Sequence, residues 1–286
     1  YNDTMSYIIL SMGPYVKGFR EKSIRMEENN QTILKSLDRA LELIDALEKA
    51  GKPLSAAELG KLLNVNRTTL YATLNTFVAR DYLEKDPVTG FYSIGLKPVE
   101  IGLGYRRKYP FIQMMDAQAL QISRKWNLQV NVGVYRAPDR VIVLSAHSPG
   151  SAPGTSYLFF PSNINFPAYA SSLGKAFLCE MEDDELRSTL DRIPLLPLTK
   201  NTYTDKAALF EHLRTLQQNG YTYEDNEYME NIRCLGVAIK DHTKRAVAGM
   251  SVVLTPFISE EERKQIISEL VSVKSLISYN LGYHTY

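Results

Sequence analysis

The sequence predicts an α+β protein in two parts: an N-terminal winged helix-turn-helix, and a C-terminal domain in which helices pack on an antiparallel sheet. Two patterns and the chain length support this fold class. Residues 36–94 have the pattern of three helices followed by a hairpin, and residues 128–254 contain short alternating apolar segments that predict strands. A chain of 286 residues suits two domains. We expect an N-terminal extension at 1–30, the winged helix at 31–96, a linker helix at 97–110 and the second domain at 111–286.

The N-terminal extension is left out of the fold. Tyr1 is not a start residue, whereas Met26, which is followed by a polar stretch, is a plausible one. The apolar run at residues 7–10 is too short for a secretion signal. We therefore treat residues 1–25 as an added segment.

The first three helices follow from apolar spacing and capping residues. The first covers residues 36–50 and ends at Gly51, and Ser55 with Glu58 forms a capping box that opens the second. A turn at 64–66 then leads to a third helix that begins near Asn66. The expected buried stripes consist of Leu37, Leu41, Ile44 and Leu47 in the first helix and of Leu70, Leu74 and Phe77 in the third.

The polar face of the third helix has the chemistry of a helix that reads bases. Arginine suits guanine, asparagine suits adenine, and threonine can donate, accept or touch a thymine methyl. The residues on or beside this face are Arg67, Thr68, Thr69, Tyr71 and Asn75. The alternative is a solvated face in an ordinary three-helix module, and spacing alone does not decide between the two. Residues 31–104 contain nine basic and nine acidic residues, so non-specific DNA affinity should be modest.

The remaining elements follow in order along the chain. Segments 82–85 and 91–94, with a turn ending at Gly90, predict the hairpin. Gly102 and Gly104 favour a bend in the linker, and the basic trio 106–108 fits a solvated turn better than a phosphate contact. The second domain should contain helices at 111–126, near 172–191, at 205–219 and from Ser259 to Gly282, and strands at 128–134, 141–146, 221–224, 235–240 and 247–254.

Composition excludes several classes of protein. Apolar residues make up 44% and charged residues 23% of the chain, which is ordinary for a globular protein. The net charge of +1 gives no large field of one sign, so nucleic-acid binding would depend on local placement. Two distant cysteines favour a reducing, cytoplasmic compartment. No stretch approaches the ~18 consecutive apolar residues of a membrane span, so we expect no membrane partner.

Four segments of the chain resemble the IclR family of bacterial transcriptional regulators. Residues 36–47 and 54–102 resemble the family's N-terminal domain, and PAYASSLGKAFLCEM (167–181) and residues 219–254 resemble its effector-binding signature. The resemblance runs in register from about residue 33 to 283. It implies a winged helix, a linker helix and a GAF-like effector-binding domain. The partners it implies are double-stranded operator DNA of pseudo-palindromic sequence, a small-molecule effector, and further copies of the chain in a homodimer or homotetramer.

Two departures from the family pattern affect the expected DNA contacts. Ala72 stands where relatives commonly carry a basic residue, and Glu84 replaces one of two wing positions that are often both basic. The expected wing contacts are therefore Lys85, Thr89 and Tyr92.

The resemblance also places effector-binding positions in the second domain. They are Ser172, Leu173, Glu224, Cys234, Ser251 and Val253. Relatives that sense small 2-oxo acids tend to have Asp at the Glu224 position and Ser at the Val253 position. With phenylalanines at 159, 160 and 166 nearby in sequence, we expect a larger, partly aromatic acid or amide. The alternative is that Ser251 and Cys234 are only small residues packed between sheet and helix.

Catalytic motifs do not fit the second domain. The Ser172–Ala176 segment lacks both the first glycine and the hydroxyl residue of a phosphate-binding loop, and the four histidines show no metal-ligand spacing with the cysteines. We therefore predict a ligand-responsive DNA-binding regulator that is not an enzyme and has no metal or cofactor. The alternative is a small-molecule-binding or catalytic domain whose helix-turn-helix makes protein contacts.

Overall fold

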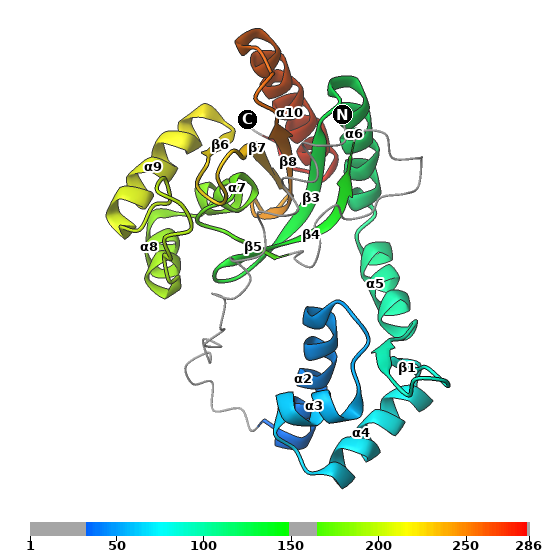
Figure 1. Ribbon diagram of the computed structural model, residues 1–286. Helices are drawn as coiled ribbons and strands as arrows, with labels where there is room; N and C mark the ends of the chain where they lie inside the picture. Colours follow the sequence, from blue (N-terminus) through cyan, green and yellow to red (C-terminus); the bar gives the residue numbers. More distant parts are fainter. Residues whose placement is uncertain (1–32, 149–164, 285–286) are drawn as a thin grey trace.

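The computed structural model describes residues 33–148 and 165–284. The predicted extension and the phenylalanines at 159 and 160 lie outside these ranges. The chain forms a small helical unit with a hairpin and a larger unit built on a sheet, joined by one helix (Figure 1). The predicted α+β class is confirmed.

The small unit follows the predicted order of elements. It contains α2 (Lys35–Ala50), α3 (Ala56–Leu63), α4 (Arg67–Ala79), β1 (Leu83–Lys85) and β2 (Tyr92–Ile94). Ser55 and Glu58 form the capping box of α3, and the Asn66 side chain accepts the Thr69 N–H at 2.8 Å to cap α4. Each cap satisfies backbone groups that the helix itself leaves unpaired.

The buried face of α2 differs from the predicted stripe. Leu37 and Leu41 are 56% and 51% exposed, whereas Leu43 and Leu47 lie in the core with Leu59. Both stripes have helical spacing, and the contacts of α2 with α3 and β2 select the second one. Leu37 and Leu41, near the N-terminus of α2, therefore face outward.

The larger unit contains a six-stranded antiparallel sheet in the order β5-β4-β3-β8-β7-β6. Its strands are β3 (Gln129–Arg136), β4 (Arg140–His147), β5 (Asn165–Pro167), β6 (Thr222–Asp225), β7 (Arg233–Lys240) and β8 (Ala246–Leu254). Its helices are α6 (Phe111–Trp126), α7 (Ser172–Cys179), α8 (Asp183–Arg192), α9 (Lys206–Asn219) and α10 (Glu260–Asn280). The helical stretch expected near 172–191 consists of two helices, α7 and α8, because the helix is interrupted at residues 180–182.

Helices cover both faces of the sheet. Helices α6 and α10 bury one face, whereas α7 lies on the other, with α8 and α9 packed beyond it (Figure 1). Side chains on the α7 face must be small: a Cβ at Gly236 would lie 2.6 Å from the Ser172 carbonyl oxygen, and one at Gly249 would lie 2.6 Å from Leu173. These glycines allow the N-terminus of α7 to lie directly on the sheet.

The linker is the continuous helix α5 (Lys97–Lys108), with no break at its two glycines. None of its residues is buried. Its C-terminal end is fixed by Arg106, which forms an ion pair with Asp116 of α6 and donates to the Leu144 carbonyl at 3.3 Å. Arg106 is therefore part of a joint rather than of the solvated turn expected from sequence.

Asp116 also holds strand β4. It accepts a hydrogen bond from Ser145, and His147 lies 3.5 Å from the same carboxyl oxygen. One carboxylate thus connects the linker to α6 and β4. None of the helices in the described ranges is long and apolar enough to cross a bilayer.

Candidate functional site

The predicted base-reading residues lie together on the exposed face of α4. Arg67, Thr68, Thr69, Tyr71 and Asn75 are all exposed, whereas Leu70 and Leu74 are buried; Arg67 and Tyr71 border the buried stripe. The Arg67 guanidinium lies 5.6 Å from the centre of the Tyr71 ring. The N-terminal two turns of the helix thus present one cation and several short polar groups to solvent.

Of the three residues predicted to contact DNA from the wing, two are exposed and one is buried. Lys85 and Thr89 are exposed, and Asp86 accepts the Thr89 N–H at 2.6 Å to hold the turn. Tyr92 is only 1% exposed. Tyr92 is therefore wrong as a DNA contact, because β2 turns its ring into the core of the small unit, where its backbone pairs with Leu54.

The N-terminus of α7 offers two backbone donors. Ser171 caps the helix by accepting the Gly174 N–H at 3.2 Å. Within the described residues, no hydrogen-bond acceptor is found for the N–H groups of Ser172 and Leu173. Such groups at the positive end of a helix favour an acceptor or an anion.

Glu224 and Cys234 lie beside this helix end. They are partners across β6 and β7, and the Cys234 thiol interacts with the side chains of Glu224 and Ser172. Glu224 Oε1 accepts the backbone N–H groups of Glu227 at 2.5 Å and Tyr228 at 3.2 Å. Burial raises the pKa of Glu224 to about 7, and burial also raises the pKa of Cys234 well above its usual value.

Ser251 and Val253 lie on the α7 face of the sheet, as their alternation predicts. Val253 pairs with Cys234, and Ser251 pairs with Gly236, which lies under Ser172. The structure therefore brings together the residues that the family resemblance assigns to the effector.

The same face contains two residues that the sequence analysis missed. Gln129 pairs with Val253 and Asn131 pairs with Ser251, so both lie on the α7 face of β3. The signal was present, because both positions alternate with Val130 and Val132. Alternating polar residues in a strand normally indicate a face exposed to solvent. Both faces of β3 are buried, so the alternation gave no indication that Gln129 and Asn131 lie in the interior.

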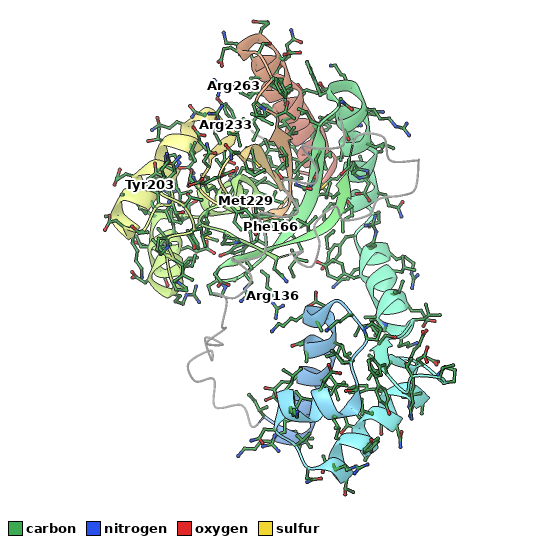
Figure 2. All side chains as sticks on the ribbon, in the orientation of Figure 1. Arg136, Phe166, Tyr203, Met229, Arg233 and Arg263 are labelled. Carbon is green, nitrogen blue, oxygen red and sulfur yellow. The ribbon has the colours of Figure 1, made fainter. Side chains whose placement is uncertain are left out.

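A second missed group lies inside α7 and beside α9. Lys175 is fully buried and forms an ion pair with Glu227. Its ammonium also lies 3.2 Å from His212 and 5.2 Å from the centre of the Tyr203 ring, which stacks on His212. Burial and then the Lys175 charge lower the pKa of His212 to about 4, so the imidazole is neutral at pH 7. Tyr203 lies next to α9 in Figure 2.

Two aromatic side chains pack against each other at the β5 edge of the sheet. Phe166 of β5, which is labelled in Figure 2, contacts Tyr228 edge-on with ring centres 5.3 Å apart and packs with Val143 and Ala146. Ala146 is the partner of Asn131 across β4 and β3. Of the phenylalanines expected near the effector, Phe166 is therefore close to the Asn131 row.

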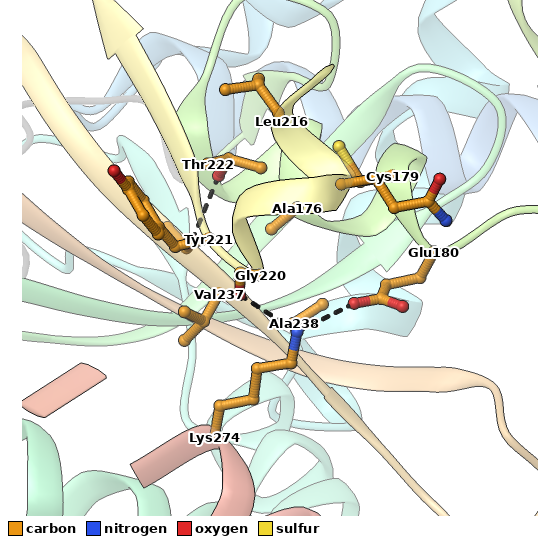
Figure 3. Close-up of a pocket in the computed structure, with 12 residues that line it drawn as sticks. Ala176, Cys179, Glu180, Leu216, Gly220, Tyr221, Thr222, Val237, Ala238 and Lys274 are labelled. Carbon is orange, nitrogen blue, oxygen red and sulfur yellow. Dashed lines mark hydrogen bonds and ion pairs between the residues drawn. The ribbon is translucent and has the colours of Figure 1, made fainter. Parts of the chain in front are cut away.

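Two cavities lie elsewhere. One, of about 10 Å³, lies beneath α7, where Lys274 donates to Glu180 and to the Gly220 carbonyl (Figure 3). It holds one water molecule at most. The other, of about 310 Å³, lies where α5 meets the larger unit and is lined by Tyr105, Tyr109 and Phe111 among others. Neither is lined by the predicted effector residues. In the described residues no group of three metal-ligating side chains gathers.

Comparisons with known proteins agree on one family. The model of the IclR helix-turn-helix domain matches residues 36–87, and that of the bacterial transcriptional regulator IclR C-terminal domain matches residues 105–279. The chain is 23% identical over 252 residues to the HTH-type transcriptional regulator XynR of Escherichia coli K12, covering 88% of this chain and 98% of XynR.

Solved structures share the fold. An IclR transcriptional regulator from Alicyclobacillus acidocaldarius aligns with a TM-score of 0.74 at 20% identity, covering 87% of this chain and 99% of the other. An IclR homologue from Microbacterium hydrocarbonoxydans, crystallised with 4-hydroxybenzoate, aligns with a TM-score of 0.73 at 19% identity, covering 86% and 99%.

Proposed function

The chain belongs to the IclR family of bacterial transcriptional regulators, and we propose that it binds a pseudo-palindromic operator whose occupancy changes when an aromatic or medium-sized acid or amide binds. Its class is a regulator with a helix-turn-helix domain and a C-terminal effector domain, not an enzyme. The operator, the effector, the oligomer, the domain boundaries and the cytoplasmic location are parts of the proposal.

The observation that carries the DNA part is the exposed polar face of α4. A recognition helix places its N-terminal residues against base edges. Arg67 stands first in α4 and pairs with guanine in this proposal, while Thr68, Thr69, Tyr71 and Asn75 contact neighbouring bases or phosphates. Lys85 and Thr89 of the wing contact the backbone.

Assembly follows from weak electrostatics. A DNA-binding part with balanced charge gains little from counterion release, so one copy binds weakly. Two linked copies raise the effective concentration of the second contact. We therefore propose a homodimer or homotetramer in which two α4 helices read the two halves of the operator.

The effector part rests on the residues around the α7 N-terminus. The N–H groups of Ser172 and Leu173 and the Ser251 hydroxyl bind the polar head, while Val253, Cys234 and Glu224 surround the rest of the ligand. The Microbacterium homologue with bound 4-hydroxybenzoate supports an aromatic acid as the first probe. The effector changes operator affinity only as far as it prefers one disposition of the DNA-binding domains.

The test is fluorescence anisotropy with labelled DNA from upstream of the chain's own gene, at stated salt, with and without 4-hydroxybenzoate. We expect the chain to bind the upstream DNA specifically, so that unrelated DNA is a poor competitor. Adding 4-hydroxybenzoate should change the affinity for the upstream DNA. Equal affinity for the upstream DNA and for unrelated DNA at every salt concentration would refute the proposal that the chain binds a specific operator.

A further inference from the structure

A continuous polar row crosses the sheet beside the N-terminus of α7. Asn131 pairs with Ser251, and Ser251 pairs with Gly236, over which Ser172 lies. Asn131 is 6% exposed and Ser251 is 4% exposed. Polar groups buried this deeply must satisfy their hydrogen bonds, so the direction of each bond in the row is informative.

The hydrogen bonds of this row run in one direction. Gln129 Nε2 donates to Asn131 Oδ1 at 2.8 Å, and Asn131 Nδ2 donates to Ser251 Oγ at 3.4 Å. The first bond occupies the Asn131 carbonyl, so Asn131 turns its amino group toward Ser251. Because Ser251 accepts from Asn131, its own hydroxyl hydrogen is available to donate.

The groups available to a ligand at this end are therefore donors. They are the Ser251 hydroxyl, the second Asn131 amino hydrogen, and the N–H groups of Ser172 and Leu173. A carboxylate accepts with both oxygens and satisfies all of them, whereas a primary amide presents its own NH₂ to donors and leaves groups unpaired.

The backbone of Glu224 is two strands away from Ser251, although its carboxyl reaches the side of the helix end through Cys234. Glu224 is on β6, two strands from Ser251 on β8, a separation of about 10 Å at ordinary strand spacing. Its Oε1 is already engaged by two backbone N–H groups. Burial raises the pKa of Glu224 to about 7, so below pH 7 a ligand carboxylate at Ser251 meets a Glu224 side chain that is mostly protonated.

We infer that Asn131, held by Gln129, is a specificity-determining residue of the effector site, and that it makes the site select a carboxylate over the matching amide. This inference rests on the proposed effector site. It narrows the effector from an acid or amide to an acid and assigns a role to a strand outside the positions that the family resemblance supplies.

The experiment is titration calorimetry of the full chain with 4-hydroxybenzoate and with 4-hydroxybenzamide. We expect the acid to bind at least ten times more tightly. In Asn131→Asp the carboxylate accepts from Gln129 and from the Ser251 hydroxyl, so the acid should lose at least tenfold in affinity and the preference should reverse. Asn131→Leu removes the donor without adding charge, so the ratio of the two affinities should fall toward one.

The control is Asn219→Asp, which makes the same chemical change at the exposed end of α9 and should leave both affinities unchanged. Thermal melting establishes that each variant is folded. If Asn131→Asp does not fold, Asn131→Leu alone tests whether Asn131 sets the preference for the acid. A merely structural role for Asn131 would weaken acid and amide by the same factor and would overturn the inference.

The outcomes separate this inference from the proposed function. Equal affinities of the wild-type chain for acid and amide would overturn the carboxylate preference while leaving an aromatic effector in place. If neither probe binds at millimolar concentration, the effector class and the inference both fail, while DNA binding is judged by the separate anisotropy experiment.

Discussion

Replacing Glu224 by Gln should stabilise the protein above neutral pH. The carboxyl is 1% exposed, and its Oε1 accepts two backbone N–H groups that a glutamine oxygen can also accept. Glutamine has nearly the same shape and no charge. The substitution therefore removes the cost of a buried charge and keeps the hydrogen bonds.

The magnitude follows from the pKa. Burial raises the pKa of Glu224 from 4.5 to about 7, and this difference corresponds to about 3 kcal/mol. Between pH 4.5 and 7 the folded state keeps a proton that the unfolded chain has released. The stabilisation is thus complete below pH 4.5 and is lost as pH rises through 7. Above pH 7 the wild type should be less stable than Glu224→Gln by up to about 3 kcal/mol.

The assay is urea unfolding of both proteins at pH 5, 6, 7 and 8. Groups with shifted pKa values that do not interact with Glu224, such as Asp116, cancel in the difference between the two proteins, whereas Glu227 and Lys175 interact with Glu224 and are part of the difference. Glu230→Gln, at an exposed carboxyl in the loop that follows β6, is the control and should run parallel to the wild type. Parallel curves for Glu224→Gln as well would show that the carboxyl is not penalised by burial.

Four further predictions concern DNA, assembly, the effector and the core. Arg67→Ala should cost ~1–3 kcal/mol of specific operator binding in anisotropy, and Lys85→Ala should weaken all sequences alike and flatten the salt slope by about one; unchanged operator affinity in the Arg67 variant contradicts the guanine contact. Light scattering should show a dimer or tetramer at micromolar concentration, and a monomer that still binds a specific operator would disprove the assembly argument. In calorimetry Val253→Ser should shift preference toward glyoxylate and pyruvate, and tighter binding of these two acids by the wild type than of aromatic acids would refute the expected size. Lys175→Met should lower the free energy of unfolding by ~3–5 kcal/mol because Glu227 is left buried without its cation, and Glu227→Gln in the same chain should restore part of it; no loss in the single variant would mean that the ion pair is unimportant.

The sequence predicted best where local chemistry decides the structure. The capping box of Ser55 and Glu58 and the Asn66 cap fix the starts of α3 and α4 through bonds between residues three positions apart. Such bonds need no knowledge of distant parts of the chain. Helical apolar spacing, which is also local, placed the exposed polar residues of α4 correctly on the surface.

Prediction failed where distant packing selects among equivalent patterns. Alternation cannot say which face of β2 is covered, and Tyr92 was assigned to the wrong one. Three residues are too few to show a period, so β5 was missed. Lys175 lies in the middle of a helix where a charged side chain is normally solvated, and its burial depends on Glu227, 52 positions away.

Helix α5 acts as a lever because it buries no side chain and is fixed at its Arg106 end. Its 12 residues span about 18 Å at the helical rise. A tilt of about 10° at the Asp116 joint therefore displaces the far end by about 3 Å. This is close to the ~3.4 Å rise of one base pair. In the proposed assembly with two such helices, we expect a small rotation at each joint to change the spacing between the two α4 helices by one or two base-pair rises, and so to set whether both fit the proposed operator.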